Sequence, residues 1–162
     1  MPVLSDHIRA EHKGIQPHLN AILTTAHAVG EVPVAIFLEM TEEVIDFLAH
    51  ELLPHAQHED DAIYTAVEQA LGAIGATNSM KREHVGIRQY VDSLIDIRGS
   101  LKTAHSISEE NVRALRRILY GLHALITMHL TVEEDVYLPL LDTLSTDTQK
   151  HFIDELSRNG HH

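Results

Sequence analysis

The most constraining feature of this sequence is an internal repeat. Residues 11–15 (EHKGI) and 83–87 (EHVGI) agree at four of five positions and lie 72 residues apart. Residues 55–61 (HAQHEDD) and 129–135 (HLTVEED), 74 residues apart, share a histidine, a glutamate four residues later and two acidic residues after it. Because the two offsets nearly agree, both matches indicate one duplicated unit, which carries first a lone histidine and then a histidine–glutamate pair.

The histidine–glutamate pairs lie in helical patterns. His129 and Glu133 are four residues apart, so on a helix they project from the same face. Around them, apolar residues recur at spacings of three and four, at Leu122, Leu125, Ile126 and Leu130. The pair is therefore expected to point into the core, where a carboxylate without a partner costs several kcal/mol. A counter-charge is needed, and a metal ion is the first candidate.

Apolar periodicity, with glycine and proline as breaks, predicts an all-α fold. Four long helices are expected, from Ser5 or Asp6 to Gly30, from Pro33 to about Leu71, from the possible caps at 77–79 to about Gly99, and from Ser106 to about Leu141. Pro54 is interpreted as a kink within the second helix, and a short extra C-terminal helix is expected to start near Thr146. Short connections predict an up-down-up-down four-helix bundle built from a duplicated helical hairpin.

Length and charge limit the remaining possibilities. A chain of 162 residues suits a single domain, 1–162, with the bundle core at about 3–142. The net charge of −12 argues against a nucleic acid or an anionic membrane as partner. The chain begins with no signal peptide and has no apolar run of about 18 residues, so the cytoplasm is the expected location. The oligomeric state is left open.

In this bundle the two halves face each other, and four histidines and two glutamates converge at one level of the core. They are His12, His55, Glu59, His84, His129 and Glu133. The chain has no cysteine, so a metal would be held by imidazole and carboxylate. This set exceeds what one tetrahedral zinc needs, and an all-oxygen calcium site would not use imidazoles. Two ions fit better, iron before manganese, with the glutamates and an oxo or hydroxo group as bridges and at least one position open.

On these paired motifs the chain resembles the hemerythrin-like, or HHE cation-binding, domains of the bacterial single-domain type. The resemblance covers residues 3–142 approximately. It implies that the six residues are ligands of a non-haem di-iron centre. It also implies a small-molecule partner, since members of the family bind or react with dioxygen, nitric oxide or peroxide, or sense iron and oxygen.

The chain departs from the oxygen-carrying hemerythrins at two positions. Those proteins have a second histidine four residues after the histidine of the third helix, and an aspartate five residues after the histidine of the fourth; here these positions hold Arg88 and Glu134. With one imidazole missing, the expected function is a catalase-like peroxide disproportionation. The alternatives are reversible binding of dioxygen or nitric oxide, and sensing of iron or oxygen without turnover. A metal-free interaction module fits the buried charges least well.

Several polar residues near the six have open roles. Tyr137 lies one α-helical turn beyond Glu133, so it is a candidate catalytic residue, as a ligand, a hydrogen-bond donor or a redox relay; a core tyrosine is the alternative. Asp60 and Glu134 could orient imidazoles or be solvated. Glu51, one turn before His55, is interpreted as a supporting acid or a solvated residue. His7 or His58 could replace one of the six if the assigned helix face is wrong.

Overall fold

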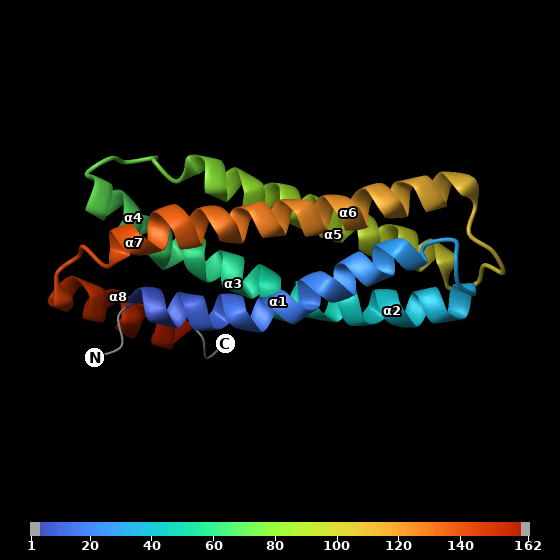
Figure 1. Cartoon of the computed structure of the whole chain (residues 1–162), viewed down its shortest axis with the longest axis horizontal. Coiled ribbons are helices and arrows are strands. Elements are labelled where there is room, and N and C mark those ends of the chain that lie inside the picture. Colours follow the sequence, from blue (N-terminus) through green and yellow to red (C-terminus); the bar gives the residue numbers. More distant parts are fainter. Residues whose placement is uncertain (1–3, 160–162) are drawn as a thin grey trace.

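A computed structural model describes residues 4–159 of the chain, with side chains up to residue 154. Within this range all regular secondary structure is helical (Figure 1). The segments, with η marking a π-helical turn, are α1 (Leu4–Ala28), α2 (Val34–Phe47), η1 (Leu48–Leu52), α3 (Leu53–His58), η2 (Glu59–Ile63), α4 (Tyr64–Leu71), α5 (Asn78–Leu101), α6 (Glu109–Val132), η3 (Glu133–Tyr137), α7 (Leu138–Leu141) and α8 (Thr146–Asn159).

Several of these segments join into longer helices. The backbone stays helical from α2 through α4, and again from α6 through α7. Pro54 and Pro139 stand near the starts of α3 and α7, each directly after a π-helical turn. A proline has no N–H for the usual helical bond, and a wider turn before it lets the helix continue. The expected continuity through Pro54 is therefore confirmed, by a π-helical turn.

The long helices pack as a bundle. Helix α1 contacts α2 and α6, and α5 contacts α6 and α2. The connections between successive long helices lie at alternating ends of the molecule, and α8 folds back beside α1 (Figure 1). The all-helical bundle is confirmed, as is the C-terminal helix, whose Phe152 is buried. One expected start is wrong: Ser108 rather than Ser106 caps α6, by accepting a hydrogen bond from the Asn111 amide.

The core consists of two apolar clusters with a polar layer between them. On α1, Ile8 belongs to the smaller cluster and Ile15 to the larger, and His12 lies between them. Helix α5 repeats this order with Met80, His84 and Ile87.

Across residues 4–159, none of the helices has both the length and the apolar character to cross a membrane.

Candidate metal centre

The structure brings all six histidine and glutamate residues together in the polar layer. They come from every long helix: His12 from α1, His55 from α3, Glu59 from η2, His84 from α5, His129 from α6 and Glu133 from η3. None exposes more than 8% of its surface. Both glutamates are the first residue of a π-helical turn, so the duplication extends to this rare backbone geometry, which is frequent at functional sites.

The six side chains form two groups that share Glu59. One group contains His12, His55, Glu59 and Glu133, and the other contains Glu59, His84 and His129. Glu59 Oε1 lies 3.0 Å from His55 Nε2 and 3.7 Å from His12 Nε2. Its other oxygen, Oε2, lies 3.3 Å from His84 Nε2 and 3.8 Å from His129 Nε2. Each oxygen of this one carboxylate therefore faces a different pair of imidazoles.

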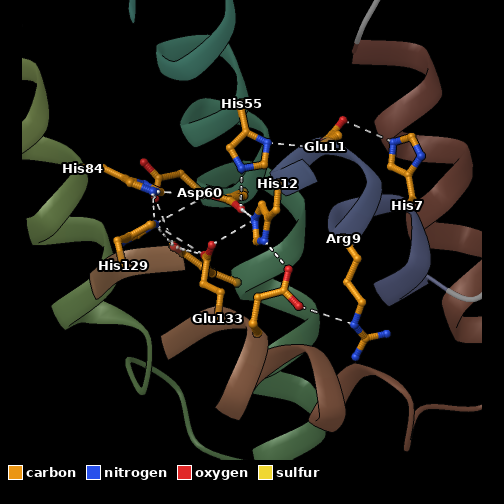
Figure 2. A network of polar contacts seen from close by, with 12 residues as sticks. His7, Arg9, Glu11, His12, His55, Asp60, His84, His129 and Glu133 are labelled. Carbon is orange, nitrogen blue, oxygen red and sulfur yellow. Dashed lines mark hydrogen bonds and ion pairs between the residues drawn. The ribbon is translucent and has the colours of Figure 1, made fainter. Parts of the chain in front are cut away.

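Glu133 spans the two groups in the same way. Its Oε2 lies 3.4 Å from His12 Nε2, and its Oε1 lies 3.5 Å from His129 Nε2. Figure 2 shows Glu133 between these two imidazoles. The two glutamates thus occupy comparable positions in the two halves of the repeat.

A carboxylate holds the outer nitrogen of every imidazole in the site. His12 Nδ1 lies 2.7 Å from Glu134, His55 Nδ1 2.8 Å from Glu11, His84 Nδ1 3.0 Å from Asp60 and His129 Nδ1 2.8 Å from Glu83 (Figure 2). Because a carboxylate accepts, each Nδ1 donates its proton outward, and in the neutral ring Nε2 presents a lone pair inward. This is the arrangement that orients metal-binding histidines in proteins.

Polar atoms at the centre lack hydrogen-bond partners among the described residues. They are Nε2 of His12 and His55, both oxygens of Glu59 and Oε2 of Glu133. The Nε2 atoms of His84 and His129 lie only 2.9 Å apart. Two imidazoles bound at right angles to one ion, about 2.1 Å from each nitrogen, would hold these atoms about 3 Å apart. The donor set therefore fits a metal, and imidazole with carboxylate suits iron.

Without an ion, protons would have to balance the buried charges. Burial disfavours the imidazolium form, but the carboxylates of Glu133 and Glu59 outweigh it and raise the pKa of His12 to about 9. Burial also disfavours the imidazolium form of His55, but the carboxylates of Glu59 and Glu11 outweigh it and raise the pKa of His55 to about 10. Burial opposes the ionised form of Glu59, yet His55 and the other imidazoles hold its pKa well below the usual range. Metal binding must therefore displace protons.

A tyrosine that the sequence analysis did not single out also lies at the centre. Tyr64 is fully buried and donates a hydrogen bond of 2.6 Å to Glu133 Oε1. Its hydroxyl lies 3.3 Å from His129 Nε2 and 3.4 Å from His84 Nε2. Burial raises the pKa of this phenol, and the charges of Glu59 and Glu133 raise it further. Tyr64 therefore stays protonated, and the imidazoles beside its hydroxyl are those of the second group.

Tyr137 lies farther from the centre because of the π-helical turn. In an α-helix the fourth residue after Glu133, Tyr137, would share the helix face of Glu133. In η3 the backbone carbonyl of Glu133 instead accepts a hydrogen bond from the fifth residue, Leu138. In the first half, the fifth residue after Glu59 is Tyr64. Tyr137 is half-buried, and its ring packs edge-on to Tyr64 with centroids 6.3 Å apart. Among the described side chains, none of the six makes a polar contact with it.

The structure also places the other residues whose roles the sequence leaves undecided. Asp60 and Glu134 both orient imidazoles, whereas Glu51 is exposed near His18. Arg88 is exposed on α5, so it does not enter the site.

The fold and the donor set define a helical metal-binding protein with a buried histidine–glutamate centre. The chain belongs to the hemerythrin family: the family model described as the hemerythrin HHE cation binding domain matches residues 3–141. The resemblance drawn from the repeated motifs is thereby confirmed over nearly the whole chain. No curated protein and no solved structure matches the sequence.

Proposed function

We propose that the six residues hold two iron ions and that the protein disproportionates hydrogen peroxide. In this reaction one peroxide is reduced to water and a second is oxidised to dioxygen, and bound iron would supply the electron exchange between them. The proposal assigns both glutamates to bridging positions, because each presents its two oxygens to different imidazoles. It also takes the four long helices as an up-down-up-down pair of duplicated hairpins, each of which supplies three of the ligands.

The observation that favours a reaction over reversible binding is the Tyr64 hydroxyl. Reducing peroxide to water breaks its O–O bond and places negative charge on oxygen, which a hydrogen-bond donor within reach stabilises. Tyr64 is a protonated phenol at the centre, hydrogen-bonded to Glu133, which can hold its proton in place. A site that only stores a ligand does not require such a donor.

The test begins with metal analysis and an oxygen electrode. Freshly purified protein is expected to contain about two irons per chain and to release one dioxygen for every two peroxides added. A protein that holds iron but releases no oxygen, and instead forms a stable dioxygen or nitric oxide adduct, would favour reversible binding or sensing.

Tyr64→Phe tests the hydrogen-bond donor role directly. It removes only the hydroxyl, so iron content should stay near that of the unmodified protein while peroxide turnover falls by about 100-fold, the usual size for loss of one donor to a developing charge. The matched control is Tyr137→Phe, which removes the neighbouring hydroxyl that lies outside the centre and should leave turnover unchanged. If Tyr137→Phe is the slower variant, the assignment to Tyr64 is wrong.

A further inference from the structure

A surface pocket of about 320 Å³ reaches the metal centre at one imidazole. It is lined by Glu11, Gly14, Ile15, Glu51, Pro54, His55 and His58. Two of its lining residues, Glu11 and His55, are hydrogen-bonded to each other, and Figure 2 shows Glu11 between His55 and His7. The inner nitrogen of His55 faces Glu59 at 3.0 Å. One imidazole ring therefore separates this pocket from the centre.

The duplication shows why the pocket is open in this half of the molecule. Gly14 and Gly86 occupy equivalent positions of the repeat. A β-carbon placed on Gly86 would lie 3.5 Å from Leu125 Cδ2, whereas a β-carbon on Gly14 would meet no atom within 4 Å. The residue equivalent to Leu125 in the first half, 74 positions earlier, is Glu51, whose side chain is 61% exposed. An apolar side chain thus covers the second glycine, and a solvated carboxylate leaves the first uncovered.

The pocket also lies on the less occupied side of the centre. Tyr64 stands against His84 and His129, in the second group. The repeat equivalent of Tyr64 is Leu138, which has no polar group to offer to His12 and His55. A small molecule entering beside His55 would therefore approach the pair of imidazoles, His12 and His55, that has no phenol beside it.

A second pocket, of about 550 Å³, is lined by His12 and in part by Arg9, Ala10 and Glu134. A carboxylate covers the outer nitrogen of the imidazole in both pockets, but in the second an arginine also holds that carboxylate. Glu134 covers the outer nitrogen of His12 at 2.7 Å, and Arg9 holds Glu134 at 3.5 Å and Asp142 at 3.6 Å. Figure 2 shows this chain from Arg9 to His12. These ion pairs tie α1 to the end of the α6–α7 helix, so that opening this route would break several contacts at once.

We propose that the pocket at Gly14, called here the Gly14 portal, is the entrance through which small uncharged molecules reach the metal centre. Its two carboxylates, Glu11 and Glu51, select against anions by like-charge repulsion. The proposal rests on the proposed function only in assuming that the centre holds iron. It assigns Glu51 a role in selecting what enters, without any contact with the metal.

The test measures association of nitric oxide with iron-loaded, reduced protein by stopped-flow absorbance. Gly14→Phe fills the portal and Glu51→Leu restores the cover seen over Gly86. Each should lower the association rate constant at least about ten-fold and leave the Kd unchanged, because an entrance slows entry and exit alike. The matched controls are Gly99→Phe, at an exposed helical glycine with no atom near its β-carbon, and Ala10→Leu in the second pocket. Both should bind nitric oxide at the unmodified rate.

A variant that changes only the charge of Glu51 tests the exclusion of anions separately from the width of the portal. Glu51→Gln keeps the size of the side chain, so nitric oxide should associate at the unmodified rate while azide, an anion, associates severalfold faster. An unchanged azide rate overturns the selective role of Glu51. Unchanged nitric oxide rates in Gly14→Phe and Glu51→Leu, or a loss confined to Ala10→Leu, overturn the portal.

Failure of the portal and failure of the proposed peroxide reaction give different results. Iron content and oxygen release of the unmodified protein are measured in the same preparations. If iron and nitric oxide bind but peroxide is not turned over, the proposed reaction is wrong and the portal result stands. If the protein holds no metal, both proposals are overturned.

Discussion

Glu59→Ala is expected to abolish binding of both metal ions, the largest effect of any single substitution in this chain. Glu59 belongs to both groups of candidate ligands, and each of its oxygens faces a different pair of imidazoles. Loss of a residue that only orients a metal-binding histidine already weakens binding by about 10- to 100-fold, and loss of a shared ligand should exceed this at both positions. Metal content after desalting should fall from about two ions per chain to nearly none.

Two further variants make this expectation specific to Glu59. Asp61→Ala removes an exposed carboxylate from the same π-helical turn, so it controls for the loss of one negative charge, and it should retain both ions. His84→Ala removes a ligand of the second group only, and it should retain one ion in the group formed by His12, His55, Glu59 and Glu133. If Glu59→Ala keeps one ion, as His84→Ala does, Glu59 serves a single metal and is not shared.

The bundle and the six central residues could be predicted because two independent signals agree. Apolar periodicity places helices along the chain, and the repeat offsets of 72 and 74 residues set the two halves in equivalent registers. A buried carboxylate at Glu133 then requires partners, and the equivalent residues of the other half are the ones available. None of this reasoning depends on the detail of a helical turn.

The π-helical turn at 59–63 could not be predicted, and Tyr64 was missed for that reason. Pro139 follows the turn at 133–137, but no proline follows 59–63, where an ordinary α-helical pattern places the fourth residue after Glu59 on its face. A turn that closes on the fifth residue moves Tyr64 to the centre and Tyr137 toward its edge. An error of one residue in the turn thus exchanges one tyrosine for the other.

The outer carboxylates were only partly predicted. Asp60 and Glu134 could be named as candidates, but whether they are solvated depends on how the two halves face each other: each contacts a histidine of the opposite half. Glu11 and Glu83 carried a signal that was available, since the glutamate is part of the repeated EHxGI motif. Each of them supports the histidine of the neighbouring helix in its own hairpin, at 2.8 Å in both cases.

Removing the metal is expected to destabilise the protein, and increasingly so as the pH rises. The folded-state pKa values of His12 and His55 are about 9 and about 10 in the metal-free protein, against 6.5 for an unperturbed imidazole, and that of His129 is also raised. A group with a raised folded-state pKa contributes its full stability below pH 6.5 and loses it as the pH rises through 9 to 10. Glu59, with a lowered pKa, contributes above pH 4.5 and loses its contribution in acid.

The metal-free protein should therefore be most stable near pH 5 to 6.5, with a Tm that falls steadily from pH 7 to pH 10. In the metal-loaded protein the imidazoles are neutral and the ions balance the carboxylates, so its Tm should change little over this range. At pH 8, chelation should lower the Tm by about 10 °C or more, the shift expected for a ligand present at about 1,000 times its Kd. Scanning calorimetry of both forms at several pH values measures these slopes.

The slope can be assigned to the centre with one pair of variants. In the metal-free protein, His55→Ala should flatten the fall in Tm between pH 7 and pH 10, because it removes the imidazole with the highest pKa cited for the site. His50→Ala, at an exposed histidine five residues earlier, should leave the slope as it is. Equal slopes in both variants and the unmodified protein would mean that protons on these imidazoles do not balance the buried carboxylates. The metal would then be replacing something other than the charge of His55.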